Sequence, residues 1–249
     1  MRIQESLALV ASLQFGISGP LDCHVYALRG PSGTVLVDAG AGTDTEQLLR
    51  NVAGDLPASR VTALLITHSH ADHCGGAGAL RDLSGCAVIA PEPSRDIVES
   101  GDEETCGLRR AREQGVYPPE FRMRPCPVDT IVRDGDRFTA AGVELTAIQV
   151  RGHSGDSFCY LTTTFGPTWL FTGDAVFYGG VLGVINADGS GMEGYRADLP
   201  KLGGLGVQGL FPGHGLFTLR GGQRHLDCAI EQVRRGFLGR QIGQGDLLF

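Results

Sequence analysis

Three histidines and an aspartate fall within one short segment, residues 68–73, which reads His-Ser-His-Ala-Asp-His. The segment directly follows an apolar stretch, 61–67, that is typical of a buried strand. Residues two apart in an extended segment project to the same side, so His68 and His70 can converge on one ion. As the chain then turns toward a helix, Asp72 and His73 can point to a neighbouring position. The segment therefore predicts imidazole and carboxylate ligands for two metal ions.

Further candidate ligands occur later in the chain, each beside glycine at the end of a predicted strand. His153 follows the predicted strand 143–151, and Asp174 follows an apolar stretch that ends at Phe171. His214 stands between two glycines after a third such stretch. Singly, a histidine or aspartate after glycine is typical of a turn. Together with segment 68–73 they form a strong pattern for a metal centre.

The elements that must position these residues follow from the apolar periodicity and the turn residues. Strands alternate with helices, and the strands are apolar, which predicts an α/β fold with helices covering sheets. Strands are predicted at 6–15, 23–29, 34–38, 61–67, 86–90, 143–151, 157–163, 168–172 and 209–211, and helices near 44–53, 76–83, 195–202 and 222–237. The sequence shows no repeat and no linker, so we predict a single domain over residues 1–249. Residues 92–128 are polar and proline-closed, which predicts a helical insertion or lid.

Composition narrows the classes of function. The 249 residues are 42% hydrophobic and 20% charged, which is typical of a globular protein and excludes a disordered chain. The formal charge of −7 and the lack of a basic run disfavour nucleic acid as a partner and leave a small-molecule substrate. The seven cysteines contain no Cys-x-x-Cys pair, which favours reduced thiols and a cytoplasmic protein. No apolar run approaches the ~18 residues that span a membrane, and a homodimer is compatible with the sequence.

In its His-x-His-x-Asp-His segment and its later His153, Asp174 and His214, the sequence resembles the metallo-β-lactamase fold superfamily over nearly its whole length, from residue 37 to residue 215. The resemblance implies a four-layer αββα sandwich and two divalent metal ions, with zinc favoured and iron or manganese as alternatives. It also implies how the ligands divide: His68, His70 and His153 on the first ion, Asp72, His73 and His214 on the second, and Asp174 bridging. Asp38, at the family's early strand-end Asp-x-Gly position, would orient a ligand.

Two neighbouring metal ions can activate a hydroxide and polarise the attacked carbonyl, so the resemblance implies a hydrolase in which Asp72 and Asp174 are catalytic. Asp72 could also pass a proton to the leaving group. Residues 173–180, with Tyr195 before a helix, look closest to the glyoxalase II-like branch, which hydrolyses thioesters. The branch's basic residue is replaced within 181–184, and no extended glutathione-binding domain is expected after His214. We therefore predict an acyl thioester, or a related ester or lactone, as the substrate.

Three alternatives remain open at this point. A mononuclear-iron oxygenase of the persulfide dioxygenase type can retain the same ligands, and oxygen consumption with iron bound would identify it. A β-lactamase is disfavoured because the bridging Asp174 is atypical of that group. A non-catalytic binding protein on the same fold predicts a lost ligand, and none is lost.

Substrate contacts are predicted from the insertion and from tyrosines after Asp174. The candidates are Arg109, Arg112, Tyr117, Phe121, Tyr178 and Tyr195. The alternative for the insertion residues is a solvated helix with an ordinary buried aromatic side chain. His24 and His225 have no motif around them and are predicted to be structural or surface residues.

Overall fold

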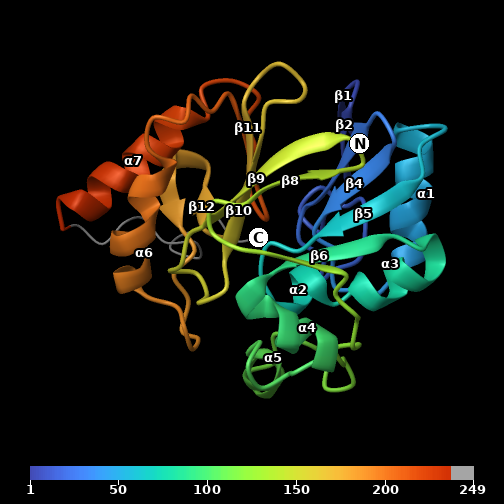
Figure 1. Cartoon of the computed structure of the whole chain (residues 1–249). Helices are drawn as coiled ribbons and strands as arrows, with labels where there is room; N and C mark the ends of the chain where they lie inside the picture. Colours follow the sequence, from blue (N-terminus) through green and yellow to red (C-terminus); the bar gives the residue numbers. More distant parts are fainter. Residues whose placement is uncertain (237–249) are drawn as a thin grey trace. The chain divides into compact units, whose positions relative to one another are not determined.

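The computed structural model describes residues 1–236 and consists of two compact units, each with its own sheet and helices (Figure 1). The first unit comprises residues 1–132 together with 139–143, and the second comprises residues 133–138 and the chain from residue 144 onward. No helix among the described residues has the length and apolar character needed to cross a bilayer.

The first unit is built on a seven-stranded sheet whose strand order in space is the order along the chain. Its strands are β1 (Arg2–Gln4), β2 (Leu7–Ala11), β3 (Val25–Gly30), β4 (Gly33–Val37), β5 (Val61–Leu65), β6 (Ala87–Pro91) and β7 (Thr130–Val132). Strands β1 to β4 pair antiparallel, and β3 and β4 join through a tight turn that closes on the pair Gly30 and Gly33. From β4 to β7 the pairing is parallel, so each connection there needs a crossover.

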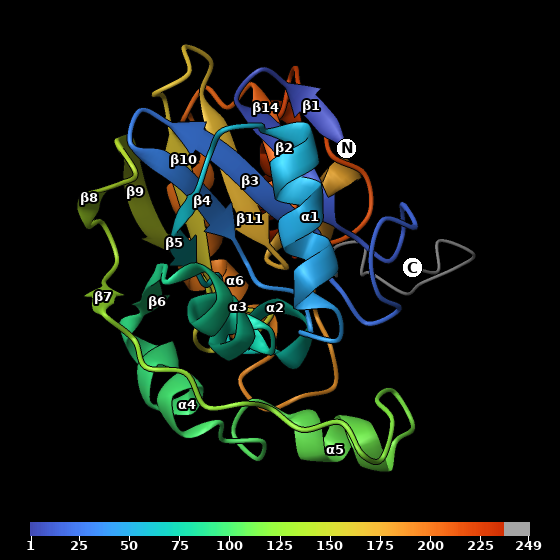
Figure 2. The ribbon, with the colours of Figure 1, turned by 90° about the vertical axis from the view of Figure 1, so that its right-hand side faces the viewer.

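Helices supply these crossovers. They are α1 (Thr45–Asp55), α2 (Ala71–Cys74), α3 (Ala77–Ser84), the 3-10 turn η1 (Glu92–Ser94), α4 (Arg95–Ser100) and α5 (Leu108–Glu113). Helix α1 begins where it does because the Asp44 carboxylate accepts a hydrogen bond from the Gln47 amide at 2.9 Å. Leu48 and Val52, one turn apart, are buried, and Figure 2 shows α1 and α3 lying against the sheet of this unit.

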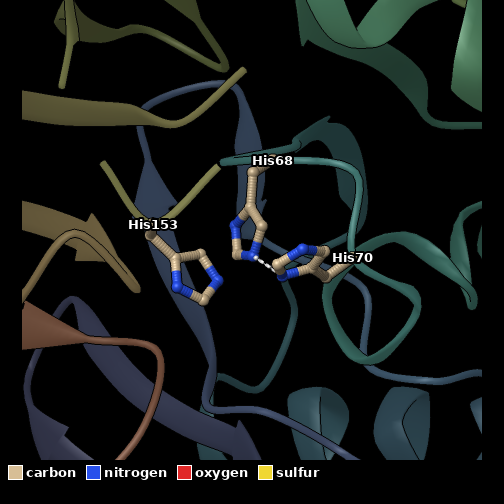
Figure 3. A group of neighbouring side chains, drawn as sticks. All are labelled: His68, His70 and His153. Atoms are coloured by element: carbon tan, nitrogen blue, oxygen red, sulfur yellow. Dashed lines mark hydrogen bonds between the residues drawn. The ribbon is translucent and has the colours of Figure 1, made fainter. Parts of the chain in front are cut away.

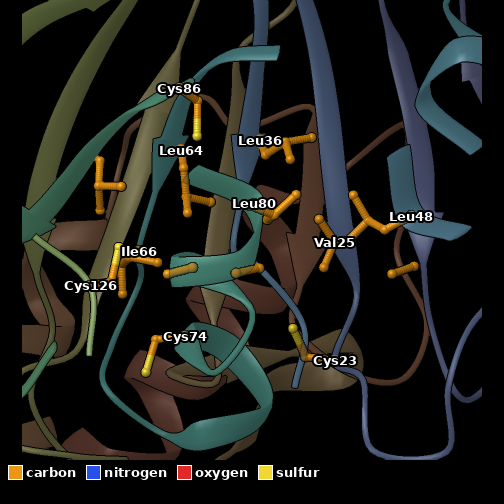
Figure 4. Close-up of a cluster of buried hydrophobic side chains, with 14 of the residues drawn as sticks. Cys23, Val25, Leu36, Leu48, Leu64, Ile66, Cys74, Leu80, Cys86 and Cys126 are labelled. Carbon is orange, nitrogen blue, oxygen red and sulfur yellow. The ribbon is translucent and has the colours of Figure 1, made fainter. Parts of the chain in front are cut away.

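The core of the first unit lies between that sheet and those helices. Leu36 and Leu64 come from the strands, and Leu48 and Leu80 come from α1 and α3 (Figure 4). Five cysteines, Cys23, Cys74, Cys86, Cys106 and Cys126, fill the same cluster as small apolar side chains, and all but Cys106 are labelled in Figure 4.

The second unit contains a five-stranded sheet in the order β14-β11-β10-β9-β8 and a two-stranded ribbon, β12-β13. The strands are β8 (Arg137–Ala140), β9 (Val143–Gln149), β10 (Phe158–Thr162), β11 (Trp169–Gly173), β12 (Val176–Phe177), β13 (Val181–Leu182) and β14 (Gly209–Pro212). Strands β9 and β11 both pair antiparallel with β10, and β14 pairs parallel with β11. Strands β9, β11 and β14 therefore run in one direction and end at the same edge of the sheet.

Four helical segments complete the second unit: η2 (Tyr178–Gly180), α6 (Met192–Asp198), η3 (Leu199–Leu202) and α7 (Gln223–Arg234). Leu170 and Leu210 from the sheet pack with Leu199 and Leu226 from η3 and α7 in one buried cluster. The predicted final helix 222–237 corresponds to α7, and its last predicted residue, Phe237, lies outside the described residues.

The buried carboxylate of Asp198 forms ion pairs with two partly exposed cations, which tie α6 and η3 to the end of β9. Asp198 accepts hydrogen bonds from Arg151 Nε at 2.6 Å and lies 2.9 Å from Lys201 Nζ. Burial raises the pKa of Asp198, but the bonds from Arg151 and Lys201 outweigh it and lower that pKa to about 2. Lys201 therefore has a structural contact.

The predicted elements agree with these boundaries to within a few residues, with one difference of kind. The helix predicted at 195–202 begins at Met192 and changes to the 3-10 turn η3 after Asp198. Pro200 lies at the start of η3, where its missing amide is tolerated and the α-helix cannot continue through it. Within the predicted insertion 92–128 the helices are η1, α4 and α5; its function as a lid and the single-domain organisation stay predictions.

Candidate metal centre

In the first unit the candidate ligands follow the ends of two parallel neighbours, β4 and β5. Asp38 comes directly after β4, and Thr67 and His68 follow β5. The side chain of Asp38 is buried, and its backbone has φ +66°, a region that non-glycine residues rarely adopt. Its amide is held by the Leu65 carbonyl at 2.8 Å. A strained, buried carboxylate at a strand end is a common device at functional sites.

Asp38 links two of the predicted histidine ligands through hydrogen bonds. Its Oδ2 lies 2.8 Å from His73 Nδ1 and accepts from Thr67 Oγ1 at 2.9 Å. Thr67 Oγ1 in turn lies 3.0 Å from His68 Nδ1. Because the Thr67 hydroxyl donates to Asp38, it accepts from His68, so both imidazoles carry their proton on Nδ1 and present Nε2. Such outer partners fix the orientation of metal-binding imidazoles.

The spacing of the ligand atoms in this unit fits metal binding. Two ligands each about 2.1 Å from a tetrahedral ion are about 3.4 Å apart. His73 Nε2 lies 3.5 Å from Asp72 Oδ2, and His68 Nε2 lies 3.1 Å from His70 Nδ1, as the dashed line in Figure 3 shows. The segment 68–73 thus offers two pairs of candidate ligand atoms at about this separation, and their division between two ions stays a prediction.

Close backbone packing holds α2 under Asp38. The Ala39 amide donates to the His73 carbonyl at 2.7 Å. A Cβ at Gly76 would lie 2.3 Å from the Ala39 carbonyl oxygen, so only glycine fits at that position. This contact explains one of the glycines beside the histidine segment.

Cys23 lies in the same cluster, and its Sγ falls within 4.8 Å of ligand atoms on Asp38 and His73. Burial raises the pKa of the Cys23 thiol. Cys23 also packs in the hydrophobic core of the first unit, which gives it a structural role.

In the second unit the three predicted ligands stand at the shared edge where β9, β11 and β14 end. His153 comes after β9, Asp174 directly after β11 and His214 after β14. Asp174 Oδ2 lies 3.6 Å from His153 Nε2 and 3.5 Å from His214 Nε2. The carboxylate oxygen of Asp174 thus lies at ligand-to-ligand distance from both imidazole nitrogens, so it can share a metal ion with each histidine.

Gly183 supports this arrangement, and sequence reasoning missed it. Its carbonyl oxygen lies 2.5 Å from His153 Nδ1, which orients the ring so that Nε2 faces Asp174. A Cβ at Gly183 would lie 2.0 Å from the Asp174 carbonyl oxygen and 2.8 Å from His153 Nδ1. The glycine in 181–184 was a visible signal, but only the fold shows what approaches it.

Tyr195 differs from its predicted role in substrate binding. Its side chain is fully buried, and its hydroxyl donates to the Ala175 carbonyl at 2.8 Å and accepts from the Gly183 amide at 3.1 Å. Burial raises the pKa of this hydroxyl. Tyr195 therefore fixes the Gly183 loop behind His153 instead of meeting a substrate, because a buried hydroxyl with two backbone partners leaves no surface for one.

The two arginines of the insertion that were predicted to contact substrate form ion pairs with glutamates. Arg109 is exposed and pairs with Glu104, and Arg112 pairs with Glu103 at 2.7 Å while Nη1 of Arg112 donates to the Phe121 carbonyl. Phe121 packs against the core of the first unit.

The tyrosines differ from each other. The Tyr117 hydroxyl donates to Asp72 Oδ1 at 3.2 Å, and burial raises its pKa. Tyr178 is 37% exposed and packs on His225, whose Nδ1 accepts from the Gly179 amide at 3.0 Å. That bond gives His225 a structural role, as predicted, and substrate contact by Tyr178 stays a prediction.

A family model of the metallo-β-lactamase superfamily matches residues 18–214, which include every predicted ligand. The chain belongs to this superfamily. A metallo-β-lactamase of Cronobacter sakazakii with a HARLDQ motif has the same fold, with a TM-score of 0.72 and 21% identity over 95% of this chain and 91% of that one. The predicted fold class is confirmed.

The superfamily members with assigned activities that resemble this chain include thioesterases. An atrochrysone carboxyl ACP thioesterase of Aspergillus fumigatus is 30% identical over 85% of this chain and 56% of its own length. The acyl-coenzyme A thioesterase MBLAC2 of Bos taurus is 26% identical over 88% of this chain and 81% of its own length. A hydroxyacylglutathione hydrolase of Idiomarina loihiensis matches 64% of this chain at 27% identity, which agrees with the predicted glyoxalase II-like branch.

Proposed function

We propose that this member of the superfamily is a metal-dependent hydrolase of acyl thioesters. Two divalent metal ions, zinc in our proposal, would be held by the seven predicted side chains: His68, His70, Asp72, His73, His153, Asp174 and His214. The ions would supply a water polarised for attack and a Lewis acid for the substrate carbonyl.

The observation that carries this proposal is the position of Asp174 Oδ2, at nearly equal distances from His153 Nε2 and His214 Nε2. Imidazole nitrogens and a carboxylate oxygen are the atoms that bind zinc, and both distances match the separation of two ligands on one ion. The 3.5 Å and 3.1 Å pairs within segment 68–73 support the same interpretation from independent residues.

The protein's own groups then have distinct tasks. Asp38, through Thr67 and directly, sets the tautomer of His68 and His73, while the Gly183 carbonyl does so for His153. Fixed tautomers keep the Nε2 lone pairs available before any ion arrives, which lowers the reorganisation needed for binding.

Thioesters are favoured as the substrate class by the relatives named above, of which two are named thioesterases. Their identity of 26–30% to this chain supports the class of bond and leaves the acyl and carrier groups open. The net charge of −7 disfavours a nucleic-acid substrate and supports a small molecule.

The test is metal analysis of protein purified without added metal, followed by one panel of acyl thioester, lactone, β-lactam and phosphodiester substrates. We expect two metal ions per chain and the highest kcat/KM on the thioester. Chelation should abolish the activity, and zinc should restore it. Oxygen consumption with iron bound and no hydrolysis would overturn the proposal in favour of the oxygenase, and lack of both metal and turnover would favour a binding protein.

A further inference from the structure

We infer that Tyr117 is a positioning residue that orients the Asp72 carboxylate toward its metal ion; this inference rests on the proposed function. The two oxygens of Asp72 have different neighbours: Oδ1 accepts from the Tyr117 hydroxyl at 3.2 Å, and Oδ2 lies 3.5 Å from His73 Nε2. The terminal torsion of an aspartate is otherwise broad, so the carboxylate can rotate. The tyrosine selects the rotamer in which Oδ2 lies beside the other ligand atom.

The segment that carries Tyr117 is held on both sides of it. Arg112, at the end of α5, pairs with Glu103 at 2.7 Å, and its Nη1 donates to the Phe121 carbonyl at 2.9 Å. Glu103 also accepts from the Met123 amide at 2.9 Å. Both side chains of the pair are mostly buried, 15% and 23% exposed, so this contact is less screened by solvent than an ordinary surface ion pair.

Packing fixes the ring as well. The Tyr117 and Phe121 rings lie 5.1 Å apart between centroids, and both pack against the core of the first unit. The Phe121 amide donates to the Pro118 carbonyl at 3.0 Å, which closes the turn between the two aromatics. These contacts hold the loop that presents the hydroxyl to Asp72, and this loop belongs to the insertion 92–128.

The contact has an alternative explanation, in which Asp72 only satisfies the hydrogen-bonding capacity of a half-buried hydroxyl. The two explanations differ in their consequences for metal binding. Outer partners of metal ligands change metal affinity by about 10- to 100-fold, whereas a hydroxyl that is merely satisfied changes stability alone.

The experiment is Tyr117→Phe, which keeps the ring and its contact with Phe121 and removes one hydroxyl. Metal affinities are measured by competition with a chromophoric chelator, and thermal unfolding is followed in the same buffer. We expect the affinity for one of the two zinc ions to fall about 10- to 100-fold, with the other unchanged. Thr105→Val is the matched control, because it removes a hydroxyl from the same insertion, where it bonds Asp102.

Two further variants make the result decisive. In an Asp72→Ala background, Tyr117→Phe should cause no additional loss of affinity, because its effect passes through that carboxylate. Phe121→Leu retains the Tyr117 hydroxyl but removes part of the packing of the loop. It should lower the affinity for the same ion by a smaller factor.

Wild-type affinity for both ions in Tyr117→Phe, or additive losses with Asp72→Ala, would overturn the inference. A wild-type protein that binds no zinc would instead overturn the proposed function, so the two failures are distinguishable.

Discussion

In the first unit four candidate ligands come from one segment of six residues, whereas in the second unit three come from three separate strand ends. The four ligands in segment 68–73, here called the local set, depend on β5 and on the short turn into α2. The other three ligands, His153, Asp174 and His214, are here called the dispersed set. They depend on the common direction of β9, β11 and β14, which places residues far apart in sequence at one edge of a sheet.

The groups that orient the imidazoles also differ between the two sets. A side-chain carboxylate, Asp38, orients the imidazoles of the local set through Thr67 and directly. A backbone carbonyl, that of Gly183, orients His153 in the dispersed set, and Tyr195 fixes that carbonyl from behind. The first unit can therefore be damaged by changing a side chain, and the second by adding one where a glycine is required.

The largest effect is expected for Asp174→Ala. Because Oδ2 of Asp174 faces both His153 and His214, its loss should lower the occupancy of both ions and reduce turnover by more than the ~10- to 100-fold typical of an outer partner. Asp72→Ala should lower the occupancy of one ion only. Metal content and kcat of the two variants are compared, with the exposed Asp188→Asn as the control. Full metal content and full activity in Asp174→Ala would show that Asp174 is not a metal ligand.

Gly183→Ala should have the next largest effect. The new Cβ would lie 2.0 Å from a backbone oxygen, that of Asp174, so the loop must shift and His153 loses its partner. We expect turnover to fall about 10- to 100-fold and the free energy of unfolding to fall by about 1–3 kcal/mol. Gly191→Ala, where a Cβ meets open space, is the control for kinetics and denaturant unfolding. Equal kinetics in both variants would mean that the carbonyl does not orient His153.

Asp38→Asn tests the support of the local set. Asparagine tolerates the φ of +66°, so the backbone is spared. The carboxylate accepts at both oxygens, from the Thr67 amide at Oδ1 and from the Thr67 hydroxyl and His73 at Oδ2, whereas an asparagine amide can accept at only one of these two positions. We expect zinc affinity, measured by chelator competition, to fall about 10-fold or more. Asp44→Asn keeps the α1 cap and serves as the control, since both residues cap helices well. Unchanged affinity in Asp38→Asn would show that the local set orients itself.

The smallest effect on the metal centre is expected for Asp198→Asn, which lies outside both sets. The pKa of Asp198 in the folded protein, about 2, is below the ordinary value of 3.8, so its contribution to stability is present above pH ~4 and is lost as the pH falls through ~2. At pH 7 we expect the free energy of unfolding of the variant to be about 1–2 kcal/mol lower, with unchanged metal content. The expected loss is kept small because Arg151 is half-exposed and solvent screens the ion pair. Urea unfolding at pH 7 and pH 3 measures this. A deficit that stays constant down to the lowest pH would contradict the ion-pair origin.

Sequence patterns were sufficient where the information is local. The apolar run 61–67 and the histidine spacing predicted a strand followed by a ligand-bearing turn, and β5 and α2 lie there. The periodicity of residues 44–53 predicted α1, because Leu48 and Val52 fall on one face. The boundary between α6 and η3 was not predicted, although Pro200 is a local signal that an α-helix cannot continue.

Contacts between distant residues could not be predicted in the same way. Tyr195 was expected to bind substrate because tyrosines near the bridging position do so by resemblance, but its burial follows from packing beside Leu199 and Leu202. Gly183 and Thr67 were not expected at all, because a carbonyl or a hydroxyl acquires its role only from the imidazole that the fold places next to it.

The sequence by itself determined the family, the types of the elements and the identity of the candidate ligands, since these depend on residue chemistry and short-range spacing. The tertiary structure decided which nitrogen each imidazole presents, that one oxygen of Asp174 faces two histidines, and that the Tyr117 hydroxyl donates a hydrogen bond to Asp72. Such details depend on strand direction and on side-chain packing between residues far apart in the chain, which no local pattern encodes.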